Sequence, residues 1–183
     1  MNNKEQVLQQ GIKELVLKMP IDEITVTTLC DYCHVNRQTF YYHFRDISDL
    51  LSSIFLTRSR SLMNLNISWD DMVVLLLDYV FKNFNYLVVI SKSSAQDILK
   101  DFFYDIVYIR VSQEIDNNPM YKEMHKEDKQ FVARIFSEAA SSELIFYISQ
   151  NIKLSYEEIL RRFHIIHDGA FQTTVKNAIN SRG

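Results

Sequence analysis

Residues 25–44 read TVTTLCDYCHVNRQTFYYHF, and this stretch decides the fold. Apolar residues recur four positions apart on both sides of residues 34–36, which predicts two short helices separated by a three-residue turn. The apolar pairs that set this spacing are Leu29 with Cys33 and Phe40 with Phe44. A pair of short helices crossing at a fixed turn is the helix-turn-helix arrangement.

The second of these helices offers an unusual set of side chains to solvent. Nearly all of them can donate hydrogen bonds and none is acidic: Arg37, Gln38, Thr39, Tyr41, Tyr42 and His43. A short helix that is fixed by its buried face and presents Arg, Gln and Tyr outward suits the major groove of DNA. We therefore expect this helix to read base pairs in double-stranded DNA.

The string RQTFYYHF at residues 37–44, followed by DLL at residues 49–51, resembles the DNA-binding signature of the TetR family of transcriptional regulators. The resemblance covers residues 5–55. Within that family, RQTFY and the later LLxxIF are similar to the dihydroxyacetone kinase operon activators. The resemblance implies an all-α protein with an N-terminal three-helix helix-turn-helix domain and a C-terminal helical domain for ligand binding and dimerisation.

The family pattern also implies roles for individual residues. Asn36, Arg37 and Gln38 would lie nearest the base edges, where Arg can bind guanine with two hydrogen bonds and Gln or Asn can pair with adenine. Thr39 would contact a thymine methyl group or a phosphate. The positions that the family places against the DNA backbone are Thr25, as the N-cap of the first helix, and Tyr41, Tyr42 and His43.

Three positions depart from the family pattern. His34 stands in the turn where glycine is usual, so a left-handed backbone there costs some strain. Thr27 and Ile47 stand where the family often has phosphate-binding cations, and Thr27 is kept among the expected DNA contacts. Residues 1–60 also balance seven Lys and Arg with seven Asp and Glu. DNA binding should therefore depend less steeply on salt than in a basic relative, and a helical interaction module without operator binding stays open as an alternative.

The composition of the chain supports an all-α protein. Only three glycines and two prolines occur in 183 residues, and helical periodicity runs through most of the chain. The net charge of −3 does not suit a protein that coats nucleic acid nonspecifically.

We find no phosphate-binding loop, nucleophile elbow or paired metal motif, so we expect no enzyme activity and no cofactor. The polar N-terminus and short apolar runs predict a cytoplasmic protein without membrane contact.

The chain divides into residues 1–66, with a long connecting helix, and residues 67–183. The second part should hold a buried helix over residues 72–89, another over 97–115, and two final helices over 127–150 and 156–180. Both final helices have small residues at mid-length, at residues 139–142 and 169–170, where helices can cross closely. We expect a homodimer through these two helices; the alternative is that they only close the core of one chain.

The second domain is rich in aromatic residues, which either line an apolar effector pocket or fill the core. The candidates for the pocket are Phe81, Phe84, Phe102, Phe103, Tyr104 and Tyr108, with His167 as a possible sensor beside it. The effector would be a small molecule or a partner protein. Metal binding by Cys30 with Cys33, or by His164 with His167, is the less favoured interpretation, because neither pair has further ligands nearby in sequence.

Overall fold

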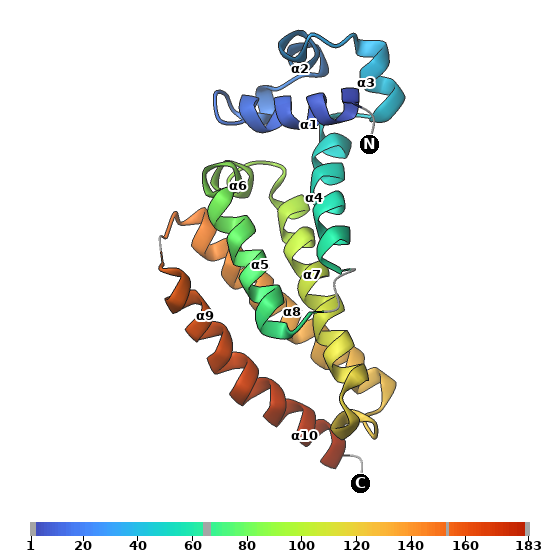
Figure 1. The fold of residues 1–183 in the computed structure, drawn as a ribbon, viewed down its shortest axis with the longest axis vertical. Coiled ribbons are helices and arrows are strands. Elements are labelled where there is room, and N and C mark those ends of the chain that lie inside the picture. The colour runs from blue at the N-terminus through green and yellow to red at the C-terminus, as the bar shows by residue number, and fades with distance from the viewer. Residues whose placement is uncertain (1–2, 64–66, 153, 182–183) are drawn as a thin grey trace.

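The structure, a computed structural model, describes residues 3–63, 67–152 and 154–181. Every regular element in these ranges is helical, which confirms the all-α prediction (Figure 1). The N-terminal helices are α1 (Asn3–Leu15), α2 (Val26–Cys33), α3 (Arg37–His43) and α4 (Ile47–Met63). The others are α5 (Trp69–Lys82), α6 (Phe84–Ser91), α7 (Gln96–Asn117), α8 (Lys126–Ser149), α9 (Tyr156–His164) and α10 (Gln172–Asn180), with short 3₁₀ turns at Ile21–Glu23 and Pro119–Tyr121.

Helix α1 holds the N-terminal domain together, because it packs against α2, α3 and α4. The core of this domain is fully buried and consists of Leu8, Ile12, Leu29, Phe40 and Leu50. Gly11 lies where α1 crosses α2, and a Cβ atom at this position would be 2.1 Å from Cys33 Sγ. A side chain at residue 11 would therefore overlap the Cys33 thiol unless Cys33 moved.

Helix α4 leaves the N-terminal domain and packs along α7, so it connects the two halves of the molecule (Figure 1). Its last described residue is Met63, and the predicted domain boundary near residue 66 lies outside the described residues. Helix α5 begins at Trp69 and is capped by Ser68, whose Oγ accepts a hydrogen bond from the amide of Asp71. A second contact joins the halves, because Ser94 Oγ donates to the carboxylate of Asp22.

The prediction of one buried helix over residues 72–89 was wrong. The chain bends by 82° between α5 and α6, at Asn83. The Asn83 side-chain amide donates to the carbonyl of Tyr79 at 2.8 Å, and its backbone leaves the helical region with φ −115° and ψ 16°. Such side-chain bonds to the backbone compete with helix continuation.

The bent pair α5 and α6 also stands out when the helices are searched for membrane spans by length and hydropathy. Across the described ranges, no single helix is both long and apolar enough to cross a bilayer, and only α5 and α6 taken together pass by length and composition. Most residues of this pair belong to the apolar core.

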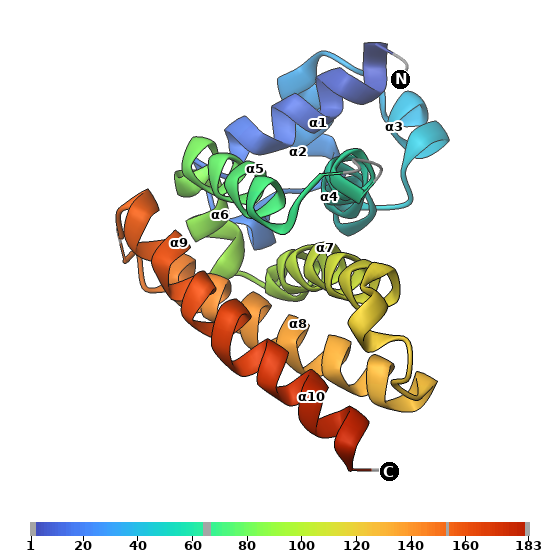
Figure 2. The ribbon, with the colours of Figure 1, turned by 60° about the horizontal axis from the view of Figure 1, so that its bottom comes forward.

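Helix α8 and the C-terminal rod, which consists of α9 and α10, lie side by side along one edge of the molecule (Figure 2). Helices α9 and α10 form one rod joined by the π-helical turn η3 (Ile165–Phe171), a feature that periodicity did not predict. Helix α8 buries one face against α7 and leaves Phe131, Ile135 and Phe146 exposed. Ile165 and Ile166 on η3 are also exposed, and within the described part of the chain a Cβ on Gly169 would meet no atom within 4 Å.

Candidate nucleic-acid interface and regulatory cavity

Two N-caps and one left-handed turn residue fix the crossing of α2 and α3. Thr25 Oγ1 accepts from the amide of Thr28 at 3.0 Å and caps α2, as predicted. His34 has the left-handed backbone that the turn requires, with φ 51° and ψ 42°. Asn36 Oδ1 accepts from the amide of Thr39 at 2.7 Å and caps α3. The recognition helix therefore starts at Arg37 in one defined orientation.

Buried aromatic rings hold α3 against the domain. Phe40 is fully buried and Phe44 nearly so, with their ring centroids 5.8 Å apart. The opposite face is exposed, and Tyr42 on it is 82% exposed. The side chains of Arg37 and Gln38 make no hydrogen bond or ion pair with any other described residue, so their donors are free for a ligand.

The other predicted contact residues surround this face. Thr25, Thr27 and Tyr41 are exposed, whereas Thr39 and His43 are half-buried. The cap formed by Asn36 matters for its predicted role, because bidentate pairing with adenine needs both the amide oxygen and the amide nitrogen. While Asn36 caps α3, its amide oxygen is held by the helix N-terminus, whereas its amide nitrogen keeps both donors for a base.

Sequence reasoning missed one exposed cation beside α3. Arg45 lies between α3 and α4 and pairs with Asp49 at 3.4 Å, while Asp46 Oδ1 accepts from the amide of Asp49. The neighbouring Ile47 is half-buried and packs on the core. Arg45 thus offers positive charge two residues before the position where Ile47 replaces the cation common in the family. Arg45 is visible in the sequence, but its position relative to α3 depends on the loop between α3 and α4.

Comparison with known proteins settles the family. Residues 68–169, more than half of the chain, match the TetR model described as a transcriptional regulator C-terminal region. The chain belongs to the TetR family of transcriptional regulators. The match starts at the cap of α5 and ends in η3, so it covers the C-terminal region of the chain without α10.

A named relative agrees with this assignment. The chain is 28% identical over 95 residues to the HTH-type dhaKLM operon transcriptional activator DhaS of Lactococcus lactis subsp. lactis (strain IL1403). This match spans 49% of the chain and only about half, 51%, of that relative.

Two solved structures share the TetR fold. A dihydroxyacetone kinase operon activator DhaS has a TM-score of 0.70 at 20% identity, covering 95% of this chain and 97% of that one. The fatty acid degradation regulator FadR from Bacillus halodurans has a TM-score of 0.59 at 14% identity, covering 92% and 96%. At these identities the likeness supports the fold alone.

The structure does not bring the seven predicted pocket residues of the C-terminal region together. Phe102 and Phe103 are buried in the core, and Tyr104 and Tyr108 stack on each other with ring centroids 5.6 Å apart. Phe81 and Phe84 border a cavity of about 630 Å³, which lies between α1, the bend after α5 and the adjoining ends of α8 and α9. His167 lies elsewhere, on η3.

His167 sits in a polar cluster that ties the C-terminal rod to the domain. Its Nε2 lies 3.0 Å from Glu114 Oε1 and its Nδ1 lies 2.9 Å from Asp168 Oδ1. The ring stacks between Trp69 and Phe171, at centroid distances of 4.9 and 5.7 Å. The Glu114 carboxylate, helped by Asp168, raises the pKa of His167 to about 9 despite partial burial.

Neither candidate metal pair gains the ligands that a metal ion needs. Among the described residues no group of three or more His, Cys, Asp or Glu side chains converges on a common point. His164 instead faces Asp168 at 3.4 Å and Asp70 at 3.7 Å. Burial raises the pKa of the Cys33 thiol to about 11, which disfavours the reactive thiolate.

The His167 cluster makes stability depend on pH. Because the pKa of His167 is about 9 in the folded chain and near 6.5 without partners, its contribution is fully present below pH 6.5 and is lost as the pH rises through 9. We expect His167→Gln to lower the free energy of unfolding by about 1 kcal/mol at neutral pH, since residual water contact screens the pair. The difference from the parent should shrink towards pH 9.5 in urea unfolding curves.

Exposed His125 provides the matched control, because its side chain forms no cap on α8. His125→Gln should leave the pH profile of stability unchanged. Parallel profiles for the parent and His167→Gln would show that the cluster does not hold a charged imidazole.

Proposed function

We propose that the protein is a homodimeric, sequence-specific DNA-binding regulator whose affinity for a palindromic operator changes when an effector binds. The observation that carries this proposal is the exposed face of α3, where Arg37 and Gln38 have free donors on a helix that Phe40 holds in place. Such a helix end can enter the major groove and bind base edges. Operator binding would take place where the chromosome is, so we assign the protein to the cytoplasm.

In this proposal the contacts divide by type. Arg37 and Gln38 read base edges, with Asn36 contributing its free amide nitrogen and Thr39 a methyl or hydroxyl contact. Phosphates are bound by the exposed or half-buried polar side chains around α3: Thr25, Thr27, Tyr41, Tyr42 and His43, with Arg45 as an added cation. Few cations take part, which is consistent with an N-terminal domain of no net charge.

The exposed apolar face of α8 and η3 supports a homodimer through the last two helices. Ile135, Phe146 and Ile165 are each about half exposed or more, and a Cβ on Gly169 of η3 would meet no described atom within 4 Å. A second copy of the same face would bury these residues in a symmetric four-helix arrangement. Two copies of α3 would then meet successive major grooves, roughly 34–36 Å apart.

Arg37→Ala tests the reading of DNA. Sequences bound by the parent are selected from a random DNA pool at modest salt, and the affinity of both proteins for the selected site is measured. The variant should lose about 1–3 kcal/mol of binding and relax one base position in each half-site. Arg60→Ala, which removes the same charge from an exposed site on α4, is the control and should bind normally.

Two results would count against a DNA reader. If the parent enriches no sequence, the helical interaction module without operator binding is favoured. If Arg37→Ala and Arg60→Ala lose the same DNA affinity, Arg37 contributes only its positive charge and does not read a base. The second candidate is an activator controlled by a partner protein in place of a small ligand, and similarity to a protein named as an operon activator supports its activator part. The presence of a sizeable cavity favours small-molecule control over that candidate.

A further inference from the structure

We propose that the 630 Å³ cavity at the junction of the two domains binds a small carboxylate with an apolar body, and that the bound molecule acts directly on α1. This inference rests on the proposed function and specifies its effector site. The site differs from the aromatic pocket expected from sequence, because one of its walls belongs to the DNA-binding domain.

The walls of this junction cavity come from both domains. Helix α1 supplies Gln10, Lys13, Glu14 and Leu17, and the bend between α5 and α6 supplies residues 80–86. The ends of α8 and α9 close the cavity with an apolar surface: Leu144, Tyr147, Ile148, Ile152, Leu154 and Ile159. Its volume lies in the range of natural small-molecule sites, and the mainly apolar lining with few polar groups is typical of them.

The cavity lining includes one cation that has no carboxylate partner among the described residues. Glu14 is already bound by Gln10 and Tyr32, at 2.8 and 2.7 Å, and Lys82 pairs with Asp78 at 3.3 Å. Lys13 alone has no carboxylate partner among the described residues, and burial lowers its pKa. An ammonium group at an apolar wall is stabilised when a ligand brings a carboxylate to it.

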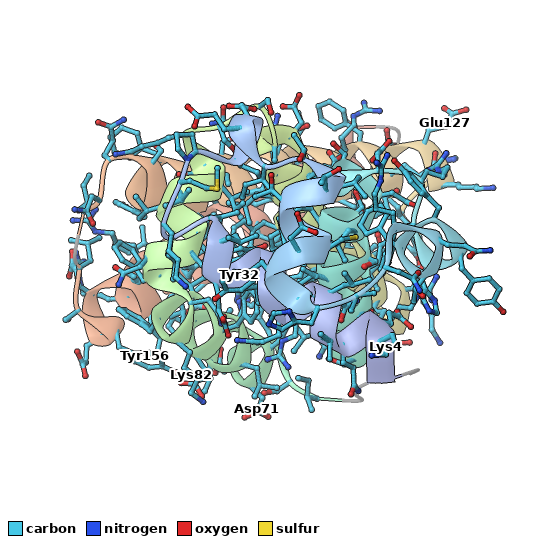
Figure 3. All side chains as sticks on the ribbon, turned by 90° about the horizontal axis from the view of Figure 1, so that it is seen from above. Lys4, Tyr32, Asp71, Lys82, Glu127 and Tyr156 are labelled. Atoms are coloured by element: carbon cyan, nitrogen blue, oxygen red, sulfur yellow. The ribbon has the colours of Figure 1, made fainter. Side chains whose placement is uncertain are left out.

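Tyr86 also lines the cavity, although its hydroxyl is buried beneath the cavity surface. Tyr86 is 5% exposed, and its hydroxyl has no hydrogen-bond partner among the described residues. Side chains on the cavity side of the molecule include Lys82, which lies near Tyr156 at the adjoining ends of α5 and α9 (Figure 3). Phe81 contacts Tyr156 there, with ring centroids 6.4 Å apart. An apolar body would extend from Lys13 towards these rings.

An occupant of the cavity would touch the helix on which the DNA-binding domain is built. The inner face of α1 carries Leu8 and Ile12 of the domain core, and Gln9 donates to Ser53 of α4 at 3.0 Å. A ligand that contacts α1 on one side and the bend at Asn83 on the other binds better to one relative orientation of the domains. Such differential affinity is what shifts a population of dimers towards or away from the operator-binding state.

The test uses decanoate and 4-phenylbutyrate as probes, with decanol and 4-phenylbutanol as matched alcohols. Binding is measured by calorimetry on the full chain without DNA. The carboxylates should bind at least about tenfold more tightly than the alcohols, and Lys13→Met should abolish that preference. Lys126→Met, which removes an exposed charge far from the cavity, should keep it. Leu17→Trp, at an exposed cavity position, should weaken all four ligands by filling space.

The outcomes separate this inference from the proposed function. No carboxylate binding at millimolar concentration, or equal binding to Lys13→Met and Lys126→Met, overturns the site even where operator selection succeeds. Carboxylate binding that depends on Lys13 but leaves operator affinity unchanged overturns the action on α1. Binding that depends on Lys13 in a protein that selects no operator supports the site and overturns the proposed function instead.

Discussion

Replacing Phe40 with alanine is expected to destabilise the N-terminal domain by about 3–5 kcal/mol, the usual range for removal of a buried aromatic ring. Phe40 is fully buried where α3 meets α1 and α2, and its ring contacts Tyr41 and Phe44 at centroid distances of 5.5 and 5.8 Å. Because the domain is small, this loss approaches its whole stability. Thermal and urea unfolding, followed by circular dichroism, should show an early transition for the N-terminal helices.

Tyr42→Ala provides the control for Phe40→Ala. It removes an aromatic ring from the same helix, but from a position that is 82% exposed, so stability should change by less than about 0.5 kcal/mol. Operator affinity should fall in both variants, in Phe40→Ala through unfolding and in Tyr42→Ala through a lost backbone contact. A stable, cooperatively folded Phe40→Ala protein would contradict the assigned core of the helix-turn-helix.

The second large effect is expected from charges placed on the exposed face of the final helices. Ile135→Glu combined with Ile165→Glu should convert the homodimer into a folded monomer, because the partner copy would bring like charges into an apolar contact. Ile135 is 49% exposed and Ile165 60%, so neither change disturbs the packing of one chain. Operator affinity should fall by about 10²–10⁴-fold, since each half-site would be bound alone.

Sedimentation equilibrium measures the oligomeric state, and titration of the selected operator measures the affinity. Leu56→Glu is the matched control, because Leu56 on α4 is equally exposed at 48% but lies away from α8 and η3. It should remain a dimer and bind the operator. A dimeric double variant would show that the last two helices only close the core of one chain.

The recognition helix was predictable from sequence because local interactions determine it. The caps at Thr25 and Asn36, the left-handed turn at His34 and the pairing of Phe40 with Phe44 all lie within twenty residues. The small residues of α8 and η3 were found in the same way, although whether a second chain covers them stays a prediction.

Features that join distant segments were not predictable. Whether Phe102 fills the core while Phe81 borders a cavity depends on how the helices pack around them. Lys13 reaches its cavity only because α1 lies against helices more than sixty residues away in sequence. Periodicity also missed the bend at Asn83 and the π-helical turn, because one side-chain hydrogen bond or one extra residue in a turn leaves the apolar pattern nearly unchanged.

The close approach at Gly11 has a consequence for exchanging parts between related regulators. Since a side chain at residue 11 would overlap Cys33, helices α1 and α2 form a matched pair. A chimera that takes residues 25–44 from a relative to change operator choice must therefore keep a small residue at position 33 or accept α1 from the same donor. Taking α1 as well would replace Lys13 and Leu17, so operator choice and effector response would be transferred together.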